Sequence, residues 1–389
     1  MATVSLCMIV KNEEKVLGRC LDSAKEIADE IIIVDTGSTD RTKEIAAEYT
    51  EKIYDFKWND DFSAARNESF RKATKDYCMW LDADDVIPER EQQKIKKLKE
   101  QLTPDVSAVM MKYVTAFDDT GKPAFLFDRE RLLKNGDGYL WGGRVHEAVA
   151  VRGKVLYSDA VIEHHSIKKE YSDRNLRIYE RMIEEGEELE PRHQFYYGRE
   201  LYYHGRNEDA VRIFETFLRD REKGAWLENL VDACRFCALC FYRMGKREEA
   251  LEKLFWTFSY DVPRPQICCD IGKHFLDENR LKEAEFWYRQ AMQTSYEPIP
   301  GAFVEPEYRE FIPAIQLAVC LDRQGKYVEA ARYNELASYY CETLTSGKPK
   351  KRRLPPSTFL TFILNSANRF RRQLPEPPTQ ALLTSLGTH

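Results

Sequence analysis

Three short apolar runs near the N-terminus constrain the fold of this 389-residue chain more than any other feature. They are VSLCMIV at residues 4–10, EIIIVD at 30–35 and YCMWLD at 77–82. Runs that are apolar almost throughout are typical of strands with both faces covered, as in a parallel sheet. Amphipathic helical patterns lie between them, over residues 12–28 and from about 39 to 49. This alternation of strand and helix predicts an α/β domain with a largely parallel sheet.

From about Tyr171 the pattern changes to helix following helix, and a repeat appears. Each copy has an alanine five positions after a turn residue, which is Gly or, in one copy, Asn279. The turn residue ends one helix, and the small alanine lets the next helix pack close to it. The copies are 34 to 46 residues apart, around the period of tetratricopeptide repeats, so we predict helical repeats of that kind; a non-repetitive helical bundle is the alternative. The four alanines are Ala210, Ala250, Ala284 and Ala330.

These patterns divide the chain into three parts. Residues 1–170 form the predicted α/β domain, residues 171–345 the helical repeats, and residues 346–389 a tail that contains basic residues and prolines. Within the tail, residues 357–373 have the pattern of a basic amphipathic helix. We expect this helix to cap the repeats; the alternative is that it binds a membrane surface or a groove on a partner.

Composition and charge narrow the class of protein. The net charge of −6 gives no general attraction to nucleic acid. Residues 1–10 lack the pattern of a signal peptide, and no run reaches the ~18 apolar residues that a transmembrane helix needs. Ten cysteines, many of them inside apolar helical patterns, are typical of buried thiols in a reducing compartment. We therefore expect a cytoplasmic protein that binds no nucleic acid and has no transmembrane segment.

Cys234, Cys237 and Cys240 recur at three-residue spacing, which leaves two interpretations open. Three thiolates could bind a metal ion or a cluster. The same spacing places them on one helical face, where small apolar residues suit helix packing, and no fourth ligand follows at a matching distance. We favour buried packing residues.

Three carboxylates follow directly after the third apolar run, in the sequence MWLDADD. Asp82, Asp84 and Asp85 would repel one another at the end of a strand unless a cation offset their charge. Mg²⁺ and Mn²⁺ prefer oxygen ligands and commonly bind through one or two carboxylates together with substrate phosphates. A solvated turn in which Asp85 caps a following helix is the alternative.

Asp35 ends the second apolar run and is followed by a turn rich in glycine and hydroxyl residues. An acid at this place can accept hydrogen bonds from a nucleobase or a ribose. A nicotinamide-nucleotide fold is disfavoured, because no G-x-G-x-x-G follows the first strand.

Together, the segments SLCMIVKNEE, IIIVDTGSTDRT, FSAARNESFRKA and MWLDADD resemble, in this order and spacing, the nucleotide-sugar half of family 2 glycosyltransferases of the GT-A fold. The resemblance implies that Asp35 holds the uracil or ribose and that Asp82 holds the ribose or a metal-bound water. It implies that Asp84 binds the metal that bridges the diphosphate. Arg66 and Asn67 match the A-R-N segment of the family, which lies along the nucleotide site.

The segment YLWGGRVHEAV concentrates reactive residue types and is expected to line the same site. Glu147 is the favoured general base, which would accept the proton of the acceptor as its oxygen or sulfur attacks the anomeric carbon. His146 could do the same or orient Glu147.

A pair of histidines, His164 and His165, follows another strand-like run. The resemblance implies that a histidine late in the domain completes the metal shell, and we favour His165 over His164. Lys168, Lys169 or Arg174 could offset the charge of the leaving group.

The chain lacks the Q-x-x-R-W signature and the membrane helices of processive synthases, and its predicted α/β domain is short. The helical repeats are therefore expected to supply part of the acceptor site, since such repeats present surfaces suited to peptides. The combination resembles peptide glycosyltransferases of the sublancin S-glycosyltransferase type.

The resulting hypothesis is an inverting, Mn²⁺- or Mg²⁺-dependent enzyme that moves a hexose from a nucleotide diphosphate sugar, UDP-sugar in particular, to a Ser, Thr or Cys side chain of a peptide or protein. A transferase for a glycan or lipid-linked envelope acceptor and a non-catalytic repeat scaffold are the alternatives. Assembly into a homo-oligomer through the repeats or the tail is left open.

Overall fold

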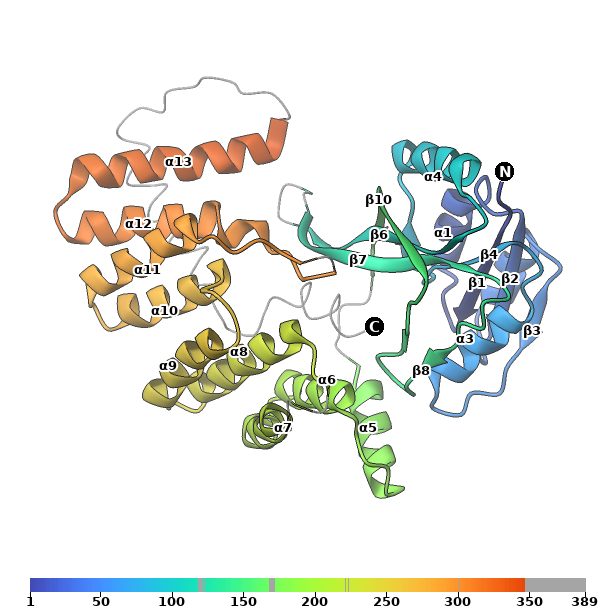
Figure 1. Cartoon of the computed structure of the whole chain (residues 1–389), viewed down its shortest axis with the longest axis horizontal. Coiled ribbons are helices and arrows are strands. Elements are labelled where there is room, and N and C mark those ends of the chain that lie inside the picture. The colour runs from blue at the N-terminus through green and yellow to red at the C-terminus, as the bar shows by residue number, and fades with distance from the viewer. Residues whose placement is uncertain are drawn as a thin grey trace. The chain divides into compact units, whose positions relative to one another are not determined.

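A computed structural model describes residues 1–117, 121, 123–167, 172–220, 222, 224–299 and 301–346, with side chains to residue 340. Lys168, Lys169 and the predicted capping helix of the tail lie outside the described residues. The chain forms two compact units (Figure 1). Among the described residues, the first comprises Met1–Ala116 and Leu126–Glu184, and the second comprises Phe117–Phe125 and residues 185–346.

The first unit is built on an eight-stranded sheet in the order β3-β2-β1-β4-β7-β6-β10-β5. β1, β2, β3 and β4 are parallel neighbours, as the apolar runs predict. β7 pairs antiparallel with β4, and β5 pairs antiparallel with β10, so the complete sheet is mixed. The strands are β1 (Val4–Val10), β2 (Glu30–Asp35), β3 (Ile53–Asp55), β4 (Tyr77–Trp80), β5 (Asp85–Val86), β6 (Val106–Phe117), β7 (Pro123–Lys134) and β10 (Lys154–His164).

Both faces of this sheet are covered. Alternate residues of β1 enter different apolar clusters, because successive side chains of a strand point to opposite faces. Leu6 and Met8 pack in the cluster that contains residues of α1 (Leu17–Ala24) and α4 (Glu89–Gln101). Cys7 packs in the cluster that contains Phe70 of α3 (Phe62–Arg71) and Trp141 of β8 (Trp141–Gly142). Two-sided burial explains why the strand runs are apolar almost throughout.

The helix predicted over residues 12–28 begins only at Leu17. The preceding residues form a loop that is fastened to the connection between β2 and α2 (Thr42–Ala47). Asn12, in the left-handed region at φ 55°, accepts a hydrogen bond from Thr39 N at 2.8 Å, and its own backbone N donates to Ser38 Oγ at 3.0 Å. These contacts between distant segments outweigh the local helical pattern.

The first unit continues past residue 170. It includes α5 (Arg174–Glu184), which the sequence pattern had grouped with the repeats. Arg181 of α5 pairs with Asp60 at 2.6 Å, and the ring of Tyr179 stacks on that of His146 at 6.2 Å. Both contacts lie within the first unit.

From residue 185 on, the described part of the second unit is built of helices that follow one another in antiparallel pairs (Figure 1), which confirms the prediction of tetratricopeptide-like repeats. All four alanines of the predicted repeat are buried at the start of the second helix of a pair. The helices are α6 (Pro191–Tyr203), α7 (Asn207–Arg219), α8 (Leu227–Arg243), α9 (Arg247–Trp256), α10 (Pro265–Asp277), α11 (Leu281–Gln293), α12 (Phe311–Arg323) and α13 (Tyr327–Ser346), with the short 3-10 helices η2 (Thr257–Ser259) and η3 (Pro306–Tyr308).

The turn inside each pair has the same geometry in all four pairs. The turn residue has positive φ, between 58° and 75°, and the next residue donates its N–H to the carbonyl five positions earlier at 2.8–2.9 Å. This is the Schellman arrangement, which satisfies free carbonyls at a helix end and favours glycine or asparagine. The four turn residues are Gly205, Gly245, Asn279 and Gly325.

The nine cysteines whose side chains the structure describes are buried and free. Cys234, Cys237 and Cys240 lie in the interior along α8, and burial raises the pKa of Cys234 and Cys240 to about 12. Such thiols are inert packing residues. Among the described residues, no helix is long and apolar enough to cross a bilayer.

Candidate active site

A pocket opens beyond the carboxyl ends of β1 and β4, where these parallel neighbours meet one edge of the sheet. Ligands of open α/β sheets bind in this crevice. Segments from six parts of the first unit contribute to its wall. The lining residues are Ile9, Val10, Lys11, Asn12, Glu13, Thr36, Trp58, Phe62, Arg66, Asp82, Ala83, Asp84, Val145, His146, Glu147, Arg174 and Asn175.

Asp35 ends β2 and is 1% exposed. Its Oδ1 accepts hydrogen bonds from the backbone N–H groups of Gly37 and Ser38, both at 2.9 Å, and so shapes the following turn. Gly37 has φ 104°, a conformation that glycine adopts without strain. Oδ2 is buried and has no hydrogen-bond partner among the described residues. Asp35 itself does not line the pocket, whereas the next residue, Thr36, does.

The three acids of the MWLDADD segment have different surroundings. Asp82 and Asp84 line the pocket, whereas Asp85 is fully buried beneath it. Asp85 Oδ2 lies 3.1 Å from Arg131 Nη1, and Oδ1 accepts a hydrogen bond from Tyr113 at 2.8 Å. The alternative of a solvated turn with Asp85 as a helix cap is wrong, because α4 begins after Pro88 and Asp85 belongs to β5.

Arg131 is the residue that keeps Asp85 ionised in the interior. Its guanidinium is fully buried and lies over the rings of Trp80 and Tyr113, at 3.9 and 4.2 Å from their centroids. Burial alone would raise the pKa of Asp85, but the charge of Arg131 and the hydrogen bond to His164 outweigh it and lower the pKa. The sequence reasoning missed Arg131; the signal that could have revealed it is a charged residue directly before the apolar pair Leu132 and Leu133 of β7.

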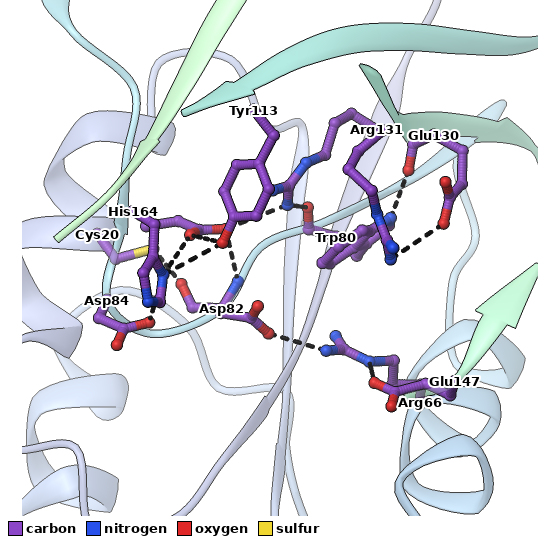
Figure 2. Close-up of polar contacts among 12 residues, drawn as sticks. Cys20, Arg66, Trp80, Asp82, Asp84, Tyr113, Glu130, Arg131, Glu147 and His164 are labelled. Atoms are coloured by element: carbon purple, nitrogen blue, oxygen red, sulfur yellow. Dashed lines mark hydrogen bonds and ion pairs between the residues drawn. The ribbon is translucent and has the colours of Figure 1, made fainter. Parts of the chain in front are cut away.

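His164, and not the favoured His165, lies with these carboxylates (Figure 2). Its Nδ1 is 3.4 Å from Asp84 Oδ1 and 3.3 Å from Asp85 Oδ1, and the three residues offer ligand atoms within 4.8 Å of one another. His165 Nε2 instead lies 2.9 Å from Glu163 Oε2. The cause is strand register: His164, the last residue of β10, pairs directly with Asp85 of β5, whereas His165 follows the end of the strand.

Arg66 of α3 joins Asp82 to the segment that contains Glu147 (Figure 2). Its Nη2 donates to Asp82 Oδ1 at 2.8 Å, and its Nε donates to Glu147 Oε1 at 2.6 Å. The guanidinium also lies over Trp80 and Trp141, at 4.8 and 4.9 Å from the ring centroids. Burial alone would lower the pKa of Arg66, but Asp82 and Glu147 outweigh it and raise the pKa, so Arg66 stays charged.

His146 and Glu147 both line the pocket and are nearly inaccessible, at 2% and 4% exposure. They lie in the hairpin formed by β8 and β9 (Ala148–Val149). His146 has φ 50°, an uncommon conformation for a residue other than glycine, which turns the chain so that both side chains reach the wall.

The remaining candidates divide between the pocket and the interior. Arg174 of α5 lines the pocket, with its guanidinium 4.5 Å from the ring centroid of Phe62. Asn67 does not line it; both groups of its amide bind the backbone of Trp141. Asp35, Arg66, Asp82, Asp84, His146 and Glu147 are thus gathered at one end of the sheet.

Comparison with known proteins identifies the α/β part. Residues 5–157 match the model of the glycosyl transferase family 2. This part of the chain belongs to glycosyl transferase family 2. The family 2 domain therefore contains the segments that carry Asp35, Arg66, Asp82, Asp84 and Glu147.

Two curated relatives are similar to parts of the chain. The chain is 28% identical over 256 residues to the SPbeta prophage-derived glycosyltransferase SunS of Bacillus subtilis, which covers 62% of this chain and 59% of SunS. It is 54% identical over 87 residues to a TPR repeat-containing protein of Synechococcus elongatus, which covers 22% of each chain. The chain thus spans between about a fifth and three fifths of the length of these relatives.

One similar solved structure is glucosyl-3-phosphoglycerate synthase from Mycobacterium tuberculosis, in complex with Mn²⁺ and UDP-glucose. The match is 21% identical, covers 29% of this chain and 44% of the synthase, and has a TM-score of 0.25.

Proposed function

We propose that the chain is an inverting, metal-dependent glycosyltransferase that moves a hexose from a nucleotide diphosphate sugar, UDP-sugar in particular, to a Ser, Thr or Cys side chain of a peptide or protein. The observation that carries this proposal is one pocket that contains Asp82 and Asp84 together with His146 and Glu147. Acids for a metal-bound donor and a base for an acceptor are the two sets of groups that the reaction needs.

The donor would occupy the side of the pocket at β1, β2 and β4. Asp35 Oδ2 would accept a hydrogen bond from the uracil or ribose, and Asp82 would hold the ribose or a metal-bound water. Asp84 and His164 would bind Mn²⁺ or Mg²⁺; we prefer His164 to His165 because its ring lies 3.4 Å from Asp84. The residues fit such an ion, since carboxylate oxygen and imidazole are ligands that Mn²⁺ accepts. When bound, the ion would neutralise charge on the departing diphosphate.

On the acceptor side, Glu147 or His146 would take the proton of the hydroxyl or thiol. The acceptor's oxygen or sulfur forms a bond to the anomeric carbon as the bond from that carbon to the diphosphate breaks, on the opposite face. Glu147 remains the favoured base, and its contact with Arg66 fixes one carboxylate oxygen while the other is left to accept the proton. Arg174 would offset negative charge on the leaving group.

A peptide acceptor is supported by the repeats of the second unit and by the resemblance to peptide glycosyltransferases. Paired helices of this kind present extended surfaces that hold peptides. The acceptor class is therefore the part of the proposal that depends on the second unit.

Thermal unfolding of the full chain tests the donor class. The midpoint would be measured with UDP, GDP and CDP, each with and without Mn²⁺, for the wild type, for Asp84→Ala and for the control Asp105→Ala, whose exposed carboxylate pairs with Lys154. A ligand present at 100 times its Kd stabilises the folded state by ~2.7 kcal/mol. We expect UDP with Mn²⁺ to raise the midpoint, and only Asp84→Ala to remove the metal-dependent part.

No shift with any nucleotide would contradict the proposal. If UDP binds, transfer from UDP-hexoses to peptides containing Ser, Thr or Cys is assayed beside transfer to glycan and lipid-linked acceptors. If sugar is transferred only to the glycan or lipid-linked acceptors, the acceptor belongs to the envelope and is not a peptide.

A further inference from the structure

The hairpin that contains His146 and Glu147 has little structure of its own to hold it. β8 and β9 have two residues each, paired as Trp141 with Val149 and Gly142 with Ala148. A two-stranded hairpin is at best marginally stable in water even when it is much longer. The position of the two candidate bases must therefore be set by other parts of the first unit.

Helix α3 provides the missing contacts. Asp61 caps its N-terminus, with a carboxylate that accepts a hydrogen bond from Ala64 N at 2.9 Å. The first residue, Phe62, donates its backbone N–H to Arg144 O at 2.8 Å. One turn later, Arg66 donates to Glu147 at 2.6 Å. The helix thus holds the hairpin at two points near its tip.

Asn67 forms the third and most specific contact. Its Nδ2 donates to Trp141 O at 3.0 Å, and its Oδ1 accepts from Trp141 N at 2.8 Å. A side-chain amide that binds both polar groups of one residue has the geometry of a paired strand. This contact takes the place of the neighbouring strand that β8 lacks on that side.

The side chain of Trp141 links this contact to the strand that leads into Asp82 and Asp84. It is 3% exposed and packs edge-on against Trp80, the last residue of β4, at 5.1 Å between ring centroids. Asp82 follows Trp80 by two residues. The position of the hairpin is therefore set relative to β4, the strand that precedes Asp82 and Asp84.

We infer that Asn67 is a positioning residue: it does not bind the nucleotide but holds the 141–149 hairpin so that the base is aligned with the donor. The inference rests on the proposed function where it concerns the base. Whether Asn67 holds the hairpin in place depends only on its two hydrogen bonds to Trp141.

Two variants test the inference in the full chain. Asn67→Leu keeps the size of the side chain and removes both hydrogen bonds, and Asn67→Asp keeps only the acceptor for Trp141 N. The matched control is Asn135→Leu, since Asn135 Nδ2 also donates to backbone carbonyls, of Ala73 and Lys75, but follows the end of β7 that pairs with the start of β4. Loss of these bonds destabilises the same unit at the other end of the sheet.

Hydrogen–deuterium exchange of the peptide covering residues 139–149 is measured first, without ligand. We expect exchange to rise at least tenfold in Asn67→Leu, less in Asn67→Asp, and not at all in Asn135→Leu. The Kd for UDP with Mn²⁺ and the kcat and KM for sugar transfer follow. We expect Asn67→Leu to leave the Kd within twofold and lower kcat more than thirtyfold.

A tenfold weaker Kd without faster hairpin exchange would overturn the inference in favour of nucleotide contact. Unchanged exchange would overturn it as well, as would unchanged kcat. If the wild type binds no nucleotide, the proposed function fails, and hydrogen exchange still decides whether Asn67 holds the hairpin.

Discussion

His164 lies directly across the β10 and β5 pairing from Asp85, and its Nδ1 is 3.3 Å from Asp85 Oδ1. Asp85 is in turn held by Arg131 and Tyr113. Both carboxylates therefore face the same ring nitrogen of His164, and the buried Asp85 fixes the orientation of that ring beside Asp84.

The assignment of His164 can be tested by metal-dependent stabilisation. We expect His164→Ala to remove the rise in unfolding midpoint that Mn²⁺ adds to UDP, because the ring beside Asp84 is lost. His165→Ala should retain that rise, since its ring faces Glu163. Loss of the rise in His165→Ala but not in His164→Ala would make His165 the metal ligand.

The buried pair of Asp85 and Arg131 makes a prediction for stability. Asp85→Asn leaves a fully buried guanidinium without its counter-charge, which costs about 3–5 kcal/mol. Arg131→Met removes the charge and keeps an apolar side chain of similar length. Urea unfolding of both single variants and the double variant should show that the double variant loses less stability than the sum of the two. Simple additivity would mean that the two groups are not coupled.

Glu147→Gln tests the favoured base. Replacing a general base typically lowers the rate by about 10²–10⁴-fold, and the amide can still accept a hydrogen bond from Arg66. We expect kcat to fall in that range while the Kd for UDP stays unchanged. Glu68→Gln, on the same helix as Arg66 but outside the pocket, is the control. A larger loss in His146→Ala than in Glu147→Gln would assign the proton transfer to His146.

A half-buried carboxylate in α8 predicts how the stability of the second unit depends on pH. Burial raises the pKa of Asp232 to about 6; Arg235 opposes this shift, and the charges of Glu228 and Glu305 add to it. Since the unfolded value is about 3.9, the stabilising effect of the neutral form is complete at lower pH and is lost as the pH rises through 6. Asp232→Asn should therefore be more stable than the wild type at pH 8, by about 1–2 kcal/mol, and equal to it near pH 4.

Asp209→Asn is the opposite control for this measurement. Hydrogen bonds from Arg206 and Arg212 lower the pKa of Asp209, so its stabilising effect is present above pH 4 and is lost as the pH falls. Asp209→Asn should lose stability at pH 8 relative to the wild type. Parallel pH profiles for the two variants would contradict both assignments.

The turns inside the helix pairs predict two changes of opposite sign. Gly245→Ala places a Cβ on a residue with φ 75°, which costs roughly 1 kcal/mol. Asn279→Gly relieves the same strain at φ 58° and should raise the free energy of unfolding by a few tenths of a kcal/mol. Urea unfolding of each variant measures the sign; stabilisation by Gly245→Ala would show that this turn tolerates a side chain.

Much of the fold follows from local patterns. The bounds of β1 and β2 agree with the apolar runs, because strands covered on both faces have no polar positions to obscure their ends. Glycine and asparagine mark the turns of the repeats, because only such residues adopt the required φ at little cost. These features depend on a few neighbouring residues.

Features that depend on pairing between distant segments could not be predicted from local sequence patterns. The choice between His164 and His165 is set by the register of β10 against β5, which are far apart in the sequence. The role of Arg131 depends on β7 lying beside β4, and that of Asn67 on a two-residue strand too short to leave a pattern. The late start of α1 likewise reflects hydrogen bonds to residues 38 and 39.

The turns inside the helix pairs share one geometry, whereas the connections between pairs differ in length. The turn inside each pair is short and has the same hydrogen bond, whereas the connection between α11 and α12 extends over residues 294–310. This connection accounts for the longest spacing, from Ala284 to Ala330, whereas the spacing from Ala210 to Ala250 also contains the longer helix α8, of 17 residues against 13 in α10. Residues can be inserted or exchanged in those connections while each pair keeps its internal packing, which makes the connections the natural sites for swapping segments between related chains.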